Sequence, residues 1–182
     1  MTDLIFVTGN ENKAKFMAQH LAMPIDHRKL DLDELQTMDL HTVVEHKVRQ
    51  AYDIVKQPVV VEDATLTFPA MGRLPGTLIK WFIEELGYDG LLKLANSLDS
   101  QEAIGLMCYG YFDGTELRFF DGEMRGHIAK EVRGDKGFGF DPIFINDGYD
   151  ITRAEMTESD YAETSYRTPA IEKLRAFLQA KA

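Results

Sequence analysis

The sequence contains a single cysteine, Cys108, among its 182 residues. One thiol excludes an intramolecular disulfide and argues against a cysteine-based metal site. Cys108 stands in the apolar run 104–109, where a thiol most often serves as a small hydrophobic side chain. We therefore expect Cys108 to be buried in the core.

Basic residues are also scarce: 20 Lys and Arg stand against 30 Asp and Glu, a formal net charge of −10. This balance argues against binding to nucleic acid backbones, which requires a basic surface. It leaves open a small phosphorylated ligand, because a bound metal and a few lysines can reverse the local charge.

Long apolar runs and a signal peptide are lacking as well. No run approaches the length of a transmembrane helix, and residues 1–7 have neither the basic region nor the apolar core of a secretory signal. These absences predict a cytoplasmic protein that does not interact with membranes.

The hydrophobic fraction of 45% is sufficient for a core, and the length predicts one domain over residues 1–182. Helices alternate with strands in the first half, and a strand-rich region follows. This order predicts an α/β protein with a mixed sheet. The expected strands are 4–8, 25–30, 59–61, 103–112, 116–120 and 123–132, and the expected helices are 13–22, 41–55, 78–86, 91–98 and 169–180.

The segment Val59-Val60-Val61-Glu62-Asp63 has the most informative pattern. A continuous Val run indicates a strand buried on both faces, and here we expect it to end in two adjacent acids. Open α/β sheets bind ligands at the carboxyl ends of their strands. Acids at that position hold a divalent cation or move a proton, although a solvated acidic turn has the same sequence.

The segment Thr8-Gly9-Asn10-Glu11-Asn12-Lys13 joins the first strand to the first helix. A glycine turn at a helix start leaves backbone N–H groups free for an anion, and Lys13 adds a positive charge. The Gly-Lys-Ser/Thr ending of a Walker motif is missing, so an ordinary strand–turn–helix with a surface lysine remains an alternative.

Three further features have two interpretations each. Glu34 lies in an acidic loop that either reaches the same crevice or is solvated. Lys47 and Lys80 have apolar neighbours, and each either extends to the surface or points at a ligand. In Gly137-Phe138-Gly139-Phe140-Asp141-Pro142, aromatic rings can stack on a base, or the loop closes the core.

Five segments together resemble the inosine triphosphate pyrophosphatase family, whose members hydrolyse non-canonical purine nucleoside triphosphates to the monophosphate and pyrophosphate. They are Thr8–Lys13, Val61–Asp63, Leu74–Phe82, Gly137–Pro142 and Ser165–Arg167, in the family's order. The resemblance implies an elongated α/β fold with a central mixed sheet, two lobes around a cleft, and a homodimer.

The resemblance also implies a role for each matching residue. Glu34 and Asp63 would hold Mg²⁺, or Mn²⁺ in its place. Asp63 would activate water, with Glu62 beside it and Lys13 assisting catalysis. The substrate-binding residues would be Thr8, Asn10, Lys13, Lys47 and Lys80 at the phosphates, and Phe138, Asp141, Ser165 and Arg167 at the base.

The chain departs from the family in the segment that reads the base. Tyr161-Ala162 replaces a common Lys-Asn pair, and Tyr166 replaces a histidine. Ala64 and Phe140 also differ from the usual residues. The loss of hydrogen-bond donors predicts altered base specificity. The alternatives are therefore a related pyrophosphatase with another base preference, or a nucleotide-binding regulatory module without turnover.

Overall fold

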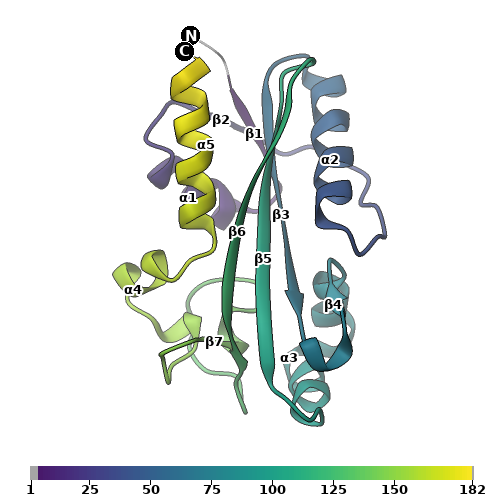
Figure 1. Ribbon diagram of the computed structural model, residues 1–182, viewed down its shortest axis with the longest axis vertical. Coiled ribbons are helices and arrows are strands. Elements are labelled where there is room, and N and C mark those ends of the chain that lie inside the picture. Colours follow the sequence, from purple (N-terminus) through teal and green to yellow (C-terminus); the bar gives the residue numbers. More distant parts are fainter. Residues whose placement is uncertain (1–3, 182) are drawn as a thin grey trace. The chain divides into compact units, whose positions relative to one another are not determined.

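The computed structural model describes residues 4–181, and Figure 1 labels its elements. Their order is β1 (Ile5–Val7), α1 (Glu11–His20), β2 (Asp26–Arg28), α2 (Leu40–Val55), β3 (Val59–Thr67), η1 (Pro69–Met71), β4 (Pro75–Gly76), α3 (Ile79–Asn96), β5 (Glu102–Phe112), β6 (Leu117–Ile128), η2 (Asp141–Ile143), β7 (Phe144–Asn146), η3 (Arg153–Glu155), α4 (Glu158–Glu163) and α5 (Arg167–Lys181).

Seven strands of the described chain form one mixed sheet in the order β2-β1-β3-β5-β6-β7, with β4 paired to β3. Strand β1 is parallel to β2 and β3, so Ile5 lies opposite both Asp26 and Val59. Strands β4 and β7 pair antiparallel with β3 and β6. The α/β class with a mixed sheet is confirmed.

The chain divides into two compact units, and each contains several chain segments. The first comprises the described parts of residues 1–63, 107–122 and 167–182, and the second comprises residues 64–106 and 123–166. In the first unit, α1 and α5 lie on one side of the sheet and α2 lies on the other (Figure 1). The apolar side of α2 packs on β1, β3 and the buried Cys108, which confirms the expected burial of the thiol.

Strand β3 differs from its prediction. The sequence suggested that the strand ends at Glu62 and Asp63, but it continues to Thr67. Its parallel neighbour ends instead: β1 pairs with β3 only as far as Val7 and Val61. The two acids therefore lie just beyond the parallel part of the sheet. Residues 65–76, to which the sequence assigned no helix or strand, contain the rest of β3, a 3₁₀ turn and β4.

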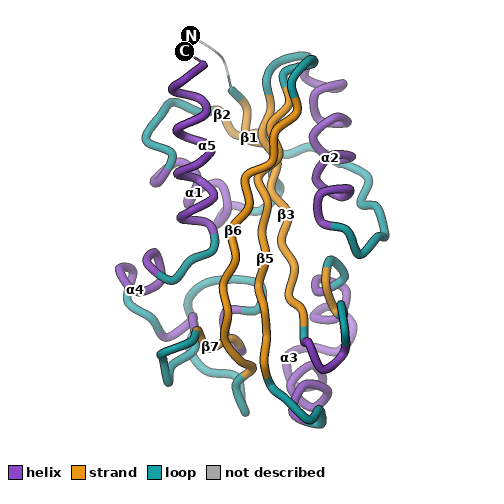
Figure 2. Tube along the Cα trace, viewed as in Figure 1, coloured by secondary structure: helices purple, strands orange, loops and turns teal. Residues whose placement is uncertain are grey.

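Other boundaries changed for local reasons. The helices expected at 78–86 and 91–98 form one element, α3, with a kink at Gly87, whose positive φ of 63° suits a residue without a Cβ. Figure 2 shows β6 as one long strand, Leu117–Ile128, in place of the two strands expected at 116–120 and 123–132. Strand β7 and helix α4 were not predicted, because each is short.

No helix in residues 4–181 has the length and apolar character needed to cross a membrane.

Candidate active site

Residues 8–13 form a capped helix start in the first unit. The Asn10 side chain accepts hydrogen bonds from the backbone N–H groups of Asn12 (2.9 Å) and Lys13 (3.2 Å). The Asn10 N–H donates to the Thr8 hydroxyl at 3.1 Å. The expectation of free N–H groups at this turn is therefore wrong for Asn12 and Lys13, because Asn10 is the N-cap. The turn fixes the direction in which Lys13 leaves the helix.

Glu62 is the centre of a buried ion cluster. Its Oε1 accepts hydrogen bonds from Arg167 Nη2 (2.8 Å) and Nε (3.1 Å), and Lys13 Nζ lies 3.2 Å away. Burial by itself raises the pKa of Glu62, but Arg167 and Lys13 more than offset this effect and hold the pKa below its usual value. The second oxygen, Oε2, is buried and has no hydrogen-bond partner.

Lys47 links the two residues expected to hold a metal. Its ammonium lies 2.6 Å from Asp63 Oδ2 and 3.1 Å from Glu34 Oε1. Burial lowers the pKa of Lys47, but the two carboxylates outweigh burial and raise it above the usual value. Lys47 is thus a charged ammonium that bridges Glu34 and Asp63.

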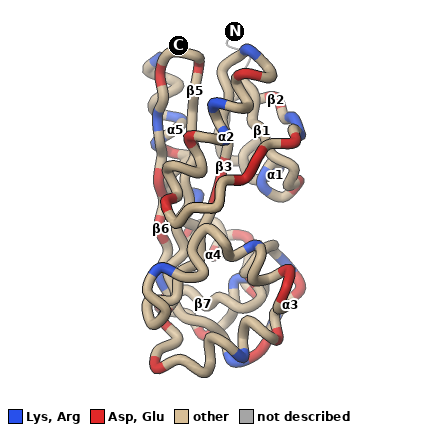
Figure 3. The backbone as a smooth tube through the Cα atoms, turned by 90° about the vertical axis from the view of Figure 1, so that its right-hand side faces the viewer, with Lys and Arg blue, Asp and Glu red and all other residues tan. Residues whose placement is uncertain are grey.

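These contacts define two acid–cation clusters, one of Glu62 with Lys13 and Arg167 and the other of Lys47 with Glu34 and Asp63. Glu62 and Asp63 are consecutive on β3, so their side chains point to opposite faces of the sheet. Along the described chain, acidic and basic residues are interspersed (Figure 3). The carboxylate oxygens of Glu34 and Asp63 are the hard donors that Mg²⁺ prefers, so the Lys47 cluster fits a divalent cation of the magnesium type.

The glycine–phenylalanine loop belongs to the second unit, and Asp141 organises it. The Phe138 N–H donates to Asp141 Oδ2 at 2.8 Å, which holds the half-buried Phe138 at the head of the loop. Gly137 has a φ of 74°, and a Cβ there would collide with the Asp141 carboxylate. The loop thus requires glycine at 137 and an acid at 141.

Arg153 is a residue that the sequence analysis missed. Its side chain is fully buried and donates to Asp141 Oδ1 (3.0 Å), Asn146 Oδ1 (2.8 Å) and the Thr164 hydroxyl (3.1 Å). Its guanidinium lies 4.1 Å from the ring centroid of Tyr161, whose hydroxyl donates to Asp141 Oδ2 at 3.0 Å. The departure at Tyr161 is therefore accompanied by a buried cation from another element.

A partial signal for Arg153 was present in the sequence. Thr152-Arg153-Ala154-Glu155 is a capping box, and both of its reciprocal hydrogen bonds form. The box predicts a turn at Thr152, but nothing in its spacing predicts that the arginine points inward.

Lys80 and Ser165 also belong to the second unit. Lys80 is exposed, with its ammonium 5.6 Å from the Trp81 ring centroid, whereas Ser165 is buried. Arg167 was expected at the base, but its guanidinium binds Glu62 in the first unit. The structure thus brings Lys13 and Arg167 to Glu62, Glu34 and Asp63 to Lys47, and Phe138 to Asp141. Thr8 and Asn10 form the turn that precedes Lys13.

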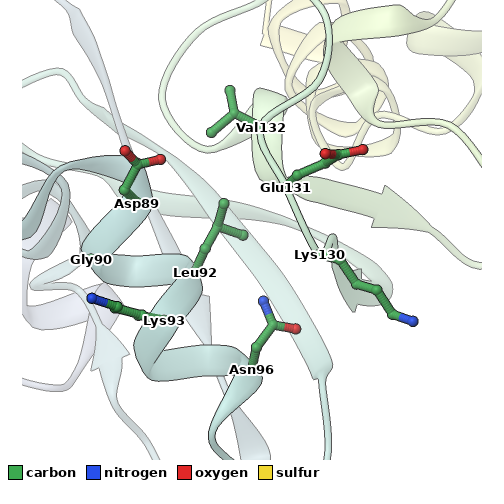
Figure 4. A pocket seen from close by; sticks show the side chains of 8 residues that line it. All are labelled: Asp89, Gly90, Leu92, Lys93, Asn96, Lys130, Glu131 and Val132. Atoms are coloured by element: carbon green, nitrogen blue, oxygen red, sulfur yellow. The ribbon is translucent and has the colours of Figure 1, made fainter.

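A pocket of about 850 Å³ lies between α3 and the segment after β6 (Figure 4). Its lining includes Lys93, Asn96, Lys130 and Glu131. None of the predicted site residues lines it, and we assign it no role.

The fold is that of solved α/β proteins. The structure of a HAM1 protein from Coxiella burnetii superposes with a TM-score of 0.86, covering 99% of this chain and 100% of that one at 22% identity. This likeness establishes the class: an α/β protein with a mixed sheet.

Sequence comparison identifies the family. The model of the Ham1 family matches residues 4–177. The inosine triphosphate pyrophosphatase of Puccinia graminis f. sp. tritici is 40% identical over 94% of each chain. The dITP/XTP pyrophosphatase of Methanopyrus kandleri is 35% identical over 93% of each chain. The chain belongs to the Ham1 family.

Proposed function

We propose that this protein is a nucleoside triphosphate pyrophosphatase that hydrolyses inosine, deoxyinosine and xanthosine triphosphates to the monophosphate and pyrophosphate. The observation that carries the proposal is the similarity, over nearly the whole chain, to two relatives named for this activity. The two acid–cation clusters support it with side chains suited to phosphate and a divalent cation.

The charge of the Lys47 cluster supports a requirement for Mg²⁺. Its two carboxylates, Glu34 and Asp63, face the single ammonium of Lys47, so the three groups carry a net negative charge. A bound Mg²⁺ would offset that charge and polarise the phosphate oxygens. Glu34 and Asp63 would hold it, and Mn²⁺ would occupy the same oxygens.

The side chains of the site bind the phosphates, neutralise their charge and accept a proton from water. Thr8, Asn10 and Lys13 hold the phosphates at the capped helix start. Lys47 would neutralise charge on the phosphates, with Glu34 and Asp63 holding the metal in its place. Asp63 accepts the proton of the attacking water, and pyrophosphate leaves from the α–β linkage. Glu62 keeps Lys13 and Arg167 in place.

The loop 137–142 is proposed to recognise the base. Phe138 stacks on the purine, and Asp141 fixes the loop that presents it. Ser165 would line the base as the family resemblance implies, whereas Arg167 serves as the partner of Glu62. We further propose that residues 1–182 act as one catalytic domain, and that the enzyme is a cytoplasmic homodimer. Light scattering coupled to size exclusion tests the dimer.

The function is tested by measuring kcat/KM with inosine, xanthosine, guanosine, adenosine and pyrimidine triphosphates in Mg²⁺. We expect pyrophosphate and monophosphate as products, with inosine and xanthosine triphosphates preferred. Tyr161 and Tyr166 replace donors worth about 1–3 kcal/mol each, so the preference over guanosine should be narrower than in relatives with Lys and His. Nucleotide binding without pyrophosphate release would instead support the regulatory module.

Lys13→Ala should lower kcat/KM about 100-fold and Lys80→Ala about tenfold, by the same factor for every base. Charge at the phosphates acts on all substrates alike, and exposed Lys80 acts in a higher dielectric. Lys15→Ala, an exposed lysine on α1, is the control and should have no effect. A loss confined to one base would move that lysine to base recognition.

Arg153→Lys should raise KM about tenfold, or roughly 1.4 kcal/mol, with a smaller change in kcat. Lysine lacks the planar fork needed to bind Asp141, Asn146 and Thr164 together, so the Phe138 loop loses its support. Arg133→Lys is the matched control, since Arg133 binds the Asp150 carbonyl at the surface. An unchanged KM in the folded Arg153 variant would contradict this role.

A further inference from the structure

His41, Cys108 and Asp121 form a second cluster of metal-competent groups in the first unit. The three residues come from α2, β5 and β6, and one ligand atom of each lies within 4.8 Å of the other two. His41 Nε2 faces the Asp121 carboxylate at 2.8 and 3.0 Å. None of these residues belongs to either acid–cation cluster described above.

Contacts outside the three ligands hold two of them in position. The His41 ring stacks on Phe119 with ring centroids 4.5 Å apart and an angle of 7° between the planes. Lys173 donates to the backbone carbonyl of Asp121 at 2.8 Å, which ties this part of β6 to α5. The imidazole is thereby oriented with Nε2 towards the carboxylate.

Burial differs among the three ligands in a way that suits a site at the surface. Cys108 is completely buried, whereas the side chains of His41 and Asp121 are about half exposed. The thiol therefore forms the floor, and the outer side is open to a water molecule or another small ligand. Such an arrangement of three protein ligands with one open position is common for zinc.

The donor chemistry also distinguishes this cluster from a magnesium site. It offers one sulfur, one imidazole nitrogen and one carboxylate oxygen, which suit zinc-like transition metals and not the all-oxygen preference of Mg²⁺. In a tetrahedral zinc site with bonds of about 2.0–2.3 Å, the ligand atoms lie roughly 3.3–3.8 Å apart. The exposed carboxylate of Asp121 can rotate to close that difference.

We propose that His41 Nε2, Cys108 Sγ and a carboxylate oxygen of Asp121 bind a zinc-like divalent transition-metal ion. The thiol proton leaves to solvent on binding, and thiolate and carboxylate then balance the charge of the ion. The ion links α2 to β5 and β6, so it stabilises the first unit. The sequence argued against a site made from cysteine; the fold adds the histidine and the acid.

Titration of the metal-free protein with Co²⁺ tests the proposal. Because Cys108 is the only thiol, a sulfur-to-cobalt charge-transfer band in the near ultraviolet can arise from this residue alone. We expect the band to appear in the wild type, to disappear when Zn²⁺ is added, and to persist in excess Mg²⁺. The metal should also raise the melting temperature.

Surface variants separate the site from the fold. His41→Ala and Asp121→Asn remove exposed ligands, and each should weaken binding by more than the roughly 10–100-fold caused by losing an outer hydrogen-bond partner of a ligand. Cys108→Ser should abolish the band. His127→Ala, an exposed histidine on β6, is the control and should bind normally.

Two results would overturn the proposal. One is a folded wild type without the band, and the other is undiminished binding in both His41→Ala and Asp121→Asn. Neither result bears on pyrophosphate release, so this proposal and the proposed function fail independently.

Discussion

Asp63→Asn should leave a folded protein with pyrophosphate release reduced at least about 100-fold. The change keeps the shape of the side chain but removes the charge that binds Lys47 at 2.6 Å and is proposed to hold Mg²⁺ and accept a proton. Activity is measured as pyrophosphate release from inosine triphosphate at saturating Mg²⁺. Circular dichroism and the melting temperature verify the fold.

Asp53→Asn is the matched control for this variant. Asp53 is an exposed acid on α2 that pairs with Lys56 at 2.9 Å, and surface pairs of this kind contribute little. Its activity and stability should remain at the wild-type level. Near-normal turnover by folded Asp63→Asn would remove Asp63 from the mechanism and favour Glu62 as the base.

Arg167→Ala should lower the free energy of unfolding by about 3–5 kcal/mol, because it leaves a buried carboxylate with one cation in place of two. Glu62 is fully buried and Arg167 nearly so, and Arg167 donates twice to the same oxygen. Urea unfolding at neutral pH measures the loss. Arg49→Ala, which breaks an exposed pair with Glu45, is the control and should cost less than about 1 kcal/mol.

The effect of Arg167→Ala should shrink in acid. In the wild type, the lowered pKa of Glu62 contributes stability above the usual Glu range, and this stability is lost as pH falls through the lowered value. In the variant, burial favours the protonated acid, which needs no cationic partner. Unfolding at neutral pH and near pH 4.5 should therefore give a smaller difference in acid. An equal difference at both values would show that Arg167 acts through packing.

Local features of the fold were readable from the sequence because they depend on neighbours along the chain. The Val run predicted a buried strand, and the 3.6-residue periodicity predicted α2 to within one residue at its start. The first helix was expected to begin at residue 13, but it begins at Glu11, because the capping by Asn10 was not recognised. The extent of β3 was missed, since it depends on pairing with β4, a two-residue strand.

The sequence did not reveal which site residues contact one another, because these contacts join residues that lie far apart along the chain. Glu34, Lys47 and Asp63 were each chosen as candidates, but their identities do not reveal that the lysine bridges the two acids. Arg167 was assigned to the base because of its place in a motif. The structure pairs it with Glu62, a residue 105 positions away along the chain.

The sequence by itself determined which side chains were available: a buried strand with two acids, a capped turn with a lysine, and a loop built on Gly137 and Asp141. Only the tertiary structure decided which acids and cations pair with one another. Arg153 and Arg167 are buried because carboxylates from distant elements, Asp141 and Glu62, surround them with acceptors. Burying a cation costs several kcal/mol unless it is paired, and partners that far apart along the chain meet only when the sheet forms.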